Sequence, residues 1–477
     1  MEGIDSMKLL PTGIENFKTM IDKSAYYVDK TNFIEDVLNE QVVSYTRPRR
    51  FGKTLNMSML YYFFSIKEKE NSYLFDGLNI SKNKDALKHQ NKYPTIFISL
   101  KEMKSLTFDA QISSFSNVIY ELLEKNLEIL SSDQLSDTTK DILNKLHNRL
   151  SSIEDLKISL RVITNALYTY YQQKVIVLID EYDVPLQAAY QNNYYEEMVE
   201  FLRSVFSSAL KTNDVLEKGI MTGCLRISKE SIFTGLNNFT AYSVLNNISC
   251  ESFGFTELEV KQLLKDYNLL EKMDEVKEWY DGYRFGNTEI YCPWDVINYA
   301  RDFMMEGRTE PACYWNNTSG NTIIRSFVED FSMDIGEEFE ALLKGGYVQK
   351  EIKEDLTYDL LHSSEENFWS VLYLTGYLTM DSSCTQEQIV RGNIYLRIPN
   401  KEVKQIFNTT VREWFLDSVK IFDRSKLFKA VWTGDEAALS NEITNLLLVT
   451  ISFFDYKEDF YHAFLAGIFA GAGYKVV

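Results

Sequence analysis

The sequence of 477 residues predicts an α/β protein built on a parallel sheet, and three observations lead to this prediction. Short runs of apolar, β-branched residues alternate with segments whose apolar residues recur at helical spacing, as in parallel strands joined by helices. These runs do not alternate between polar and apolar residues, so we expect strands that are buried on both faces. The alternation holds over the first half of the chain. We therefore predict one α/β domain over residues 1–250.

Five runs in this first domain are candidate strands. Between the second and the third lies a long helical region that includes IEDLKISLRVITNALYTYY, in which apolar residues recur at helical spacing. The fifth run is the least regular of the set. The candidate strands are VVSYTRP from Val42, PTIFISL from Pro94, KVIVLID from Lys174, KGIMTG from Lys218 and YSVLNNIS from Tyr242.

The character of the sequence changes near Ser249. Thr256 and Glu259 have the spacing of a capping box, which predicts the start of a new helix. We expect a helical region over residues 251–301, broken by turn residues in WYDGYRFGNTEIYCP, and a third region over residues 302–420 that ends in a strand, a turn and a helix. Residues 421–477 form the last predicted unit.

Composition and charge narrow the classes of function. The chain has 50 Lys and Arg against 69 Asp and Glu, a formal charge of -19 that repels a nucleic-acid backbone. No apolar run approaches the 18 residues of a membrane helix, so we expect a soluble, cytoplasmic protein without a membrane partner. The five cysteines contain no C-x-x-C pair, and neither a zinc site nor a disulfide framework is predicted.

The segment after the first candidate strand has the order of a phosphate-binding loop. It reads RPRRFGKT and continues into KTLNMSMLYYFF, whose apolar residues share one helical face. Such a loop needs a strand, a tight turn and a helix, because N–H groups and the dipole at the helix start attract phosphates. Lys53 would reach the β- and γ-phosphates, and the Thr54 hydroxyl would bind Mg²⁺. We predict a site for ATP and Mg²⁺ at Arg47, Pro48, Arg49, Arg50, Phe51, Gly52, Lys53 and Thr54.

Two residues of this segment depart from the usual loop. Arg47 stands where a glycine normally permits the sharp turn, and Pro48 has no N–H group to donate. Arg49 and Arg50 would compensate with positive charge. The alternative interpretation is that GKT is only a helix start at a turn.

The third candidate strand ends in two adjacent acids, Asp180 and Glu181. Carboxyl ends of strands in open α/β sheets face the crevice that binds ligands. We assign Asp180 to Mg²⁺, together with Thr54, and Glu181 to catalysis as the base that activates the attacking water. With PTIFISL as an intervening strand, this pattern fits a P-loop NTPase core of the class with an additional strand and a catalytic glutamate. The alternative is a buried strand that ends at a polar turn.

Two further candidates follow the fourth strand. Thr222 lies near its carboxyl end and would sense the γ-phosphate, and Arg226 would act in catalysis by stabilising charge in the transition state. The alternative for Arg226 is a packing or surface role, which is common for an arginine after a strand.

Several segments resemble one family along nearly the whole chain. The sequence resembles the bacterial AAA-ATPase-like proteins that are often joined to a PD-(D/E)XK-type nuclease domain, in which RPRRFGKT replaces a glycine-led loop. The resemblance implies ATP binding through Lys53 and Thr54, acids at Asp180 and Glu181, a helical lid over 251–301 and a winged-helix-like region within 302–420. It rests on YYVDKTNFIEDVL, TRPRRFGKTLNMSMLYYFF, VIVLIDEYDVPL, TGCLRISKESIFTGLNNF, WYDGYRFG and YLRIPNKEV.

The end of the chain, EDFYHAFLAGIFAGAGYKVV, resembles the first helix and opening strand of such a nuclease domain. We expect a truncated start of that domain within 421–477 and no nuclease activity from this chain, since the metal-binding acids would lie beyond Val477.

Two functions from different classes follow from these expectations. The first is an Mg²⁺-dependent ATPase whose cycle moves or gates the C-terminal domains. The second is an ATP-binding switch or scaffold with negligible turnover that regulates a nuclease or another partner protein. Assembly of several copies and binding of nucleic acid stay open, and the net charge counts against the latter.

Overall fold

The computed structural model describes most of the chain, and all structural statements below concern this part. The described residues are 7–211, 213–226, 239–308, 310–315, 336–356, 364–409 and 425–450.

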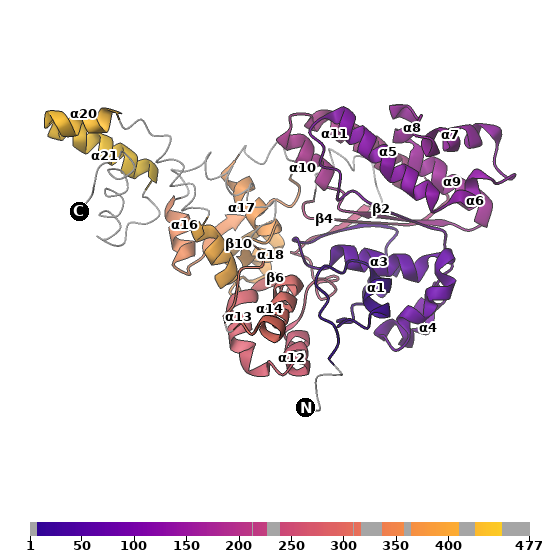
Figure 1. The fold of residues 1–477 in the computed structure, drawn as a ribbon, viewed down its shortest axis with the longest axis horizontal. Coiled ribbons are helices and arrows are strands. Elements are labelled where there is room, and N and C mark those ends of the chain that lie inside the picture. The colour runs from indigo at the N-terminus through magenta and orange to yellow at the C-terminus, as the bar shows by residue number, and fades with distance from the viewer. Residues whose placement is uncertain are drawn as a thin grey trace.

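A five-stranded parallel sheet forms the centre of the first half of the chain (Figure 1). Its spatial order is β2-β3-β4-β1-β5, so β4 lies between β1 and β3. All residues of β1 and β3 are buried, as expected for strands covered on both faces. The strands are β1 (Val42–Thr46), β2 (Thr95–Ser99), β3 (Val175–Asp180), β4 (Leu216–Gly223) and β5 (Phe239–Tyr242).

The pairing register brings the carboxyl ends of four strands to one edge. Thr46 pairs with Gly223, and Ser99 pairs with Asp180. Between β3 and β4, Ile179 pairs with Met221. Polar residues that end or directly follow these strands are therefore neighbours across the sheet edge.

Helices cover both faces of the sheet (Figure 1). On one face lie α5 (Phe108–Glu124), α6 (Leu127–Leu130), α7 (Asp137–His147), α8 (Ile153–Lys157), α9 (Ser159–Tyr171), α10 (Val184–Gln191) and α11 (Tyr195–Leu210). The other side of the domain contains α1 (Phe17–Asp22), α2 (Phe33–Leu38), α3 (Lys53–Phe64), α4 (Lys84–Leu87) and the 3₁₀ segments η1 (Ile66–Phe75) and η2 (Asn79–Lys82).

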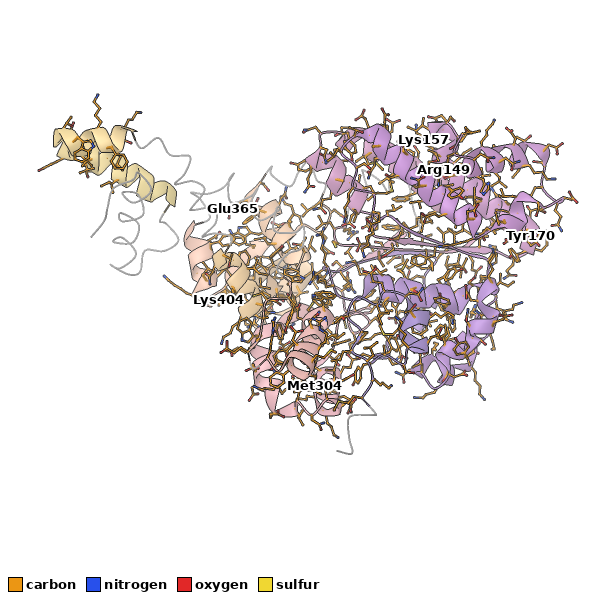
Figure 2. All side chains as sticks on the ribbon, viewed as in Figure 1. Arg149, Lys157, Tyr170, Met304, Glu365 and Lys404 are labelled. Carbon is orange, nitrogen blue, oxygen red and sulfur yellow. The ribbon has the colours of Figure 1, made fainter. Side chains whose placement is uncertain are left out.

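Side chains fill the space between the sheet and both helical layers (Figure 2). Long helices such as α5 and α9 turn one apolar stripe to the sheet, with Phe115 and Ile163 fully buried. At the outer ends of these layers, polar and aromatic side chains such as Lys157 and Tyr170 point away from the core (Figure 2). The sheet and its helices thus form one continuous apolar core.

A group of helices and a hairpin follows the sheet domain. The helices have a separate apolar core in which Val260, Leu263 and Tyr280 pack with Leu10 of the N-terminal segment, whereas buried residues of the hairpin belong to the core of the sheet domain. The elements are α12 (Glu257–Asp266), η3 (Leu270–Lys272), α13 (Met273–Tyr280), the hairpin strands β6 (Tyr283–Phe285) and β7 (Thr288–Ile290), and α14 (Pro293–Glu306).

A three-stranded antiparallel sheet of order β8-β10-β9 organises the next part. Its helices and strands are α16 (Gly336–Leu343), β8 (Val348–Glu351), α17 (Glu365–Leu374), β9 (Thr379–Met380), α18 (Gln386–Arg391) and β10 (Asn393–Arg397), followed by helical residues 401–409. The helical pair α20 (Ser425–Thr433) and α21 (Glu436–Thr450) lies at the far left of Figure 1.

Most of the helices and strands predicted from the sequence and located in the described residues are present in the structure. The α/β class, the parallel sheet and the first four strands are confirmed. The fifth expected strand, which was to start at Tyr242, is wrong, because β5 ends at that residue and Asn246 closes a turn by accepting a hydrogen bond from Ser243 N at 2.7 Å. The capping box at Thr256 and Glu259 is confirmed. Residues 451–477, with the expected nuclease-like helix, lie outside the described residues.

Two kinds of feature are absent from the described residues. No helix among them has both the length and the apolar character needed to cross a membrane. Within the same residues, no group of three or more His, Cys, Asp or Glu side chains is arranged to hold a metal ion.

Candidate nucleotide-binding site

The loop between β1 and α3 makes its turn at Arg50 and Gly52. These two residues have positive φ angles of 70° and 84°, and Gly52 is the N-cap of α3. Arg47 is not among the described residues with a left-handed backbone. The position that usually holds glycine therefore does not need one here, because the sharp turn lies three residues later. The first N–H groups of α3, which have no partners inside the helix, follow this turn directly.

The Arg47 side chain points away from the loop and into the protein. Its guanidinium donates to the carbonyl oxygens of Thr46 at 2.8 Å, Tyr242 at 2.9 Å and Ile248 at 3.3 Å. It also lies over the ring of Phe253, 5.0 Å from the ring centre. The residue is fully buried, and burial lowers the pKa of Arg47 to about 10. Arg47 thus connects β1, the end of β5 and the segment after β5 that contains Ile248.

Lys53 is buried within the loop. Its Nζ donates to the carbonyl oxygens of Arg47 at 3.1 Å and Pro48 at 3.0 Å, and it lies 3.5 Å from Cys224 Sγ. Burial acts to lower the pKa of Lys53, but nearby Cys224 and Glu181 act in the opposite direction, and the pKa is raised overall. The lysine is therefore a permanent cation at the centre of the loop.

Asp180 is buried behind the loop and joins two threonines. Its Oδ2 accepts a hydrogen bond from Thr54 Oγ1 at 2.8 Å, and its Oδ1 accepts one from Thr222 Oγ1 at 2.6 Å. Burial raises the pKa of Asp180, while the hydrogen bonds from the threonines oppose this rise. The pairing of Ile179 with Met221 across β3 and β4 brings Thr222 beside Asp180.

Glu181 directly follows Asp180 but, unlike Asp180, lines a cavity beside the loop. Its φ angle of 53° turns the chain sharply after β3. A left-handed backbone at a non-glycine residue costs free energy, and such strain gathers at functional sites. The two adjacent acids are therefore separated, with one carboxylate against Thr54 and the other at the cavity.

The cavity has a volume of about 540 Å³, which is within the usual range for sites that bind small molecules. One wall is the loop and the start of α3. A second wall is the N-terminal segment, and a third comes from the helical region after the sheet. The lining includes Arg49–Asn56 without exception, Pro11, Gly13–Glu15, Tyr26–Val28, Lys30, Lys101, Lys104, Glu181, Phe255, Trp294 and Ile297.

The predicted residues divide into two groups in this structure. Arg49, Arg50, Phe51, Gly52, Lys53, Thr54 and Glu181 line the cavity, whereas Arg47, Pro48, Asp180, Thr222 and Arg226 do not. Asp180 and Thr222 support the loop from behind through Thr54. Arg226 forms ion pairs, with Asp355 at 2.9 Å and Glu354 at 3.7 Å. Its predicted role in the transition state stays a prediction.

Sequence reasoning missed Asp183 and Cys224. Asp183 is buried, and its Oδ2 accepts hydrogen bonds from the N–H groups of Cys224 at 3.0 Å and Leu225 at 3.1 Å. It thereby fixes the turn after β4 next to Lys53. The second aspartate in IDEYD was the available sequence feature, since it lies three residues after Asp180.

Oxygen groups of the kind that bind Mg²⁺ meet at the inner end of the loop. Thr54 and Asp180 supply a hydroxyl and a carboxylate in direct contact. Mg²⁺ in nucleotide sites typically takes only one or two protein ligands and completes its shell with phosphate oxygens and water. The residues present therefore fit Mg²⁺ held together with a nucleotide.

Comparisons with known proteins agree with this geometry. Residues 11–233 match the model of a family described as AAA-ATPase_like, predicted AAA-ATPase. A protein of Azotobacter chroococcum mcd 1, described as an uncharacterized protein in the vnfD 5' region, is 27% identical over 407 residues. That alignment covers 84% of this chain and 70% of the relative. The match of residues 11–233 to this family of predicted AAA-ATPases indicates nucleotide binding.

Proposed function

We propose that this chain binds ATP with Mg²⁺ and hydrolyses it, and that the cycle shifts the domains after the sheet. The observation that carries the proposal is the division of the two acids after β3. Asp180 contacts Thr54 at 2.8 Å, and Glu181 lines the cavity beside the loop. A metal-binding carboxylate and a general base are needed on different sides of the same phosphate group.

Each loop residue has a distinct part in the proposed reaction. Lys53 and the N–H groups at the start of α3 bind and orient the phosphates. Glu181 accepts a proton from the water that attacks the terminal phosphorus, while the bond from that phosphorus to the bridging oxygen breaks and ADP leaves with the electron pair. When bound at Thr54 and Asp180, Mg²⁺ supplies positive charge that offsets the charge on the phosphate oxygens. Thr222 holds Asp180 in position through their 2.6 Å hydrogen bond.

The contacts of the loop support movement of the later domains. Arg50 donates to the carbonyl oxygen of Tyr314 and lies 4.4 Å from the ring centre of Trp294. Phe51 is fully buried against the rings of Tyr283 and Phe285, each 5.1 Å away between ring centres. A shift of the loop on nucleotide binding would therefore be transmitted directly to the β6–β7 hairpin and to α14.

The experiment measures release of phosphate from Mg-ATP and nucleotide affinity on the same samples. We expect Glu181→Gln to lower turnover by roughly 10²–10⁴-fold and to preserve binding, because only the base is removed. Lys53→Ala should lose binding as well. The controls are Glu154→Gln and Lys145→Ala, which change exposed side chains on α8 and α7. Equal turnover in wild type and Glu181→Gln would remove Glu181 from the mechanism.

A second candidate function is an ATP-binding switch with negligible turnover. The observation in its favour is that Arg226 pairs with Asp355 and Glu354 and does not line the cavity. Without the guanidinium of Arg226 beside the terminal phosphate, stabilisation of the transition state would be weaker and hydrolysis slower. Tight binding of Mg-ATP by the wild type, without phosphate release, would favour this second candidate.

A further inference from the structure

Two lysines that sequence reasoning did not single out lie at the cavity. Lys101 and Lys104 follow the end of β2, and both line the cavity with Glu181. The roles assigned above to the loop and to Asp180 and Glu181 do not involve these two lysines. Their position just after β2 places positive charge at the carboxyl edge of the sheet, beside the cavity.

The sheet register explains why Lys101 lies next to Glu181. Ser99 pairs with Asp180 across β2 and β3, and the N–H of Leu100 donates to the carbonyl oxygen of Asp180 at 2.9 Å. Lys101 directly follows Leu100, and Glu181 directly follows Asp180. The proposed base and this ammonium group therefore leave neighbouring strands side by side.

In this structure Lys101 is paired with Glu15. The Lys101 Nζ lies 2.6 Å and 2.9 Å from the two carboxylate oxygens of Glu15. Both side chains are partly exposed, at 38% and 55%, and Glu15 also lines the cavity. Burial acts to lower the pKa of Lys101, but Glu15 and Glu181 raise it overall, so the group stays charged. An ion pair this exposed contributes little to stability and is readily exchanged for another anion.

The N-terminal segment that includes Glu15 is attached to the helices after the sheet. Lys30 donates to both carboxylate oxygens of Glu259 on α12 at 2.7 Å. Tyr26 donates to Asp266 at the end of the same helix at 2.8 Å. The pair of Glu15 with Lys101 therefore connects the sheet edge to a segment that is fastened to α12.

We propose that Lys101 is a positioning residue for the terminal phosphate of ATP, and that Glu15 holds it until the nucleotide competes for it. This inference rests on the proposed function, because it assigns a further residue to the same site. A terminal phosphate carries more negative charge than a single carboxylate and offers several acceptor oxygens. Transfer of Lys101 from Glu15 to the phosphate would also release the N-terminal segment from the sheet edge.

The test compares the affinities for Mg-ADP and for the Mg complex of an ATP analogue whose terminal bridge is an imido group. Lys101→Met should weaken binding of the analogue by about tenfold and change that of ADP much less, since only the analogue has a third phosphate. Glu15→Gln should strengthen binding of the analogue relative to ADP, because the competing carboxylate is gone. Lys101→Arg should retain most of the preference for the analogue.

The matched controls are Lys145→Met and Asp141→Asn, which break an exposed ion pair on α7. They should leave the ratio of the two affinities unchanged. If the wild type binds both nucleotides but the ratio is also unchanged in Lys101→Met and Glu15→Gln, the inference is overturned and the proposed function stands. If the wild type binds neither nucleotide, both fail.

Discussion

Arg47 shows that the role of a residue in this loop depends on its backbone angles. In the sequence it replaces an expected glycine, which suggests a damaged turn. In the structure the loop residues with a left-handed backbone are Arg50 and Gly52. The Arg47 side chain is buried and donates hydrogen bonds to carbonyl oxygens in the interior. A long cation with three carbonyl acceptors holds together segments that a glycine could not connect.

Two buried carboxyl groups, Asp295 on α14 and Glu402 on the helix of residues 401–409, predict a pH-dependent stability. Burial raises the pKa of Asp295 to about 6, and burial together with the charge of Asp295 raises that of Glu402 further. Both groups bind protons more tightly in the folded chain than in the unfolded chain. The stability they contribute is therefore fully present below about pH 4 and is lost as the pH rises through the raised values.

We expect Glu402→Gln to reduce this loss. At pH 8 the variant should be more stable than the wild type by about 1–3 kcal/mol, because glutamine is neutral in both states and folding no longer requires that the carboxyl group at position 402 take up a proton. At pH 4 the two proteins should differ little. The measurement is the free energy of unfolding in urea at both pH values, with the exposed Glu387→Gln as the control. A wild type and a variant with parallel pH profiles would contradict this account of Glu402.

At the scale of single residues, the sequence predicted the chemical type of the side chains at the sheet edge better than their hydrogen-bond partners. Adjacent acids at the end of a buried strand indicated a polar edge, and Asp180 does end β3. The acceptors of Arg47 lie 195 and 201 positions later in the chain, at Tyr242 and Ile248. No local pattern connects residues so far apart, and only the pairing of β1 with β5 brings them together.

At the scale of elements, α12 depends on the capping box that was visible in the sequence. Thr256 Oγ1 accepts a hydrogen bond from Glu259 N, and a Glu259 carboxylate oxygen accepts one from Thr256 N at 2.7 Å. Glu259 also accepts from Lys30, so this cap is part of the connection to the N-terminal segment. The same carboxylate thus caps the helix and holds Lys30, which lines the cavity.

Thr256→Ala should lower the free energy of unfolding by about 1 kcal/mol, since one N–H group at the helix start loses its acceptor. Thr256→Ser retains the hydroxyl and should lose much less. Urea unfolding of the three proteins provides the measurement. Equal losses in the serine and alanine variants would show that the methyl group of Thr256 matters and the cap does not.

The strands show what periodicity can and cannot predict. Buried apolar runs located β1 to β4 because burial on both faces leaves an uninterrupted hydrophobic segment. The run from Tyr242 was misjudged because Asn246 accepts from the backbone and favours a turn. The spatial order of the strands in the sheet could not be predicted from the sequence either. PTIFISL lies between the first and third strands in sequence, but β2 is at the sheet edge and β4 separates β1 from β3.

At the scale of the whole molecule, the antiparallel part reaches the nucleotide loop at Gly376. This glycine has a φ angle of 90°, and a Cβ atom built there would lie 3.0 Å from Pro48 Cβ. Pro48 supplies one of the two carbonyl acceptors of Lys53. Close packing at Gly376 therefore affects Pro48 and, through its carbonyl group, Lys53, which binds the phosphates in the proposed function.

Gly376→Ala should weaken nucleotide affinity although Gly376 does not line the cavity, because the added methyl group pushes against Pro48. Gly345→Ala is the matched control, since Gly345 has the same φ angle of 90° but no atom within 4 Å of the added carbon. Both variants should lose about 1–3 kcal/mol of stability from backbone strain. Measuring affinity at a temperature where both are folded separates the effects, and equal affinities would contradict coupling through Pro48.

The burial of Arg47 also determines how the protein can be divided for experiments. The family match ends at residue 233, while two acceptors of the guanidinium and the ring of Phe253 lie after that position. A fragment cut there would leave a charged side chain inside a core with most of its partners removed, which is strongly destabilising. The smallest portion of this chain suitable for binding studies therefore extends beyond the matched region and includes the hairpin that encloses Phe51.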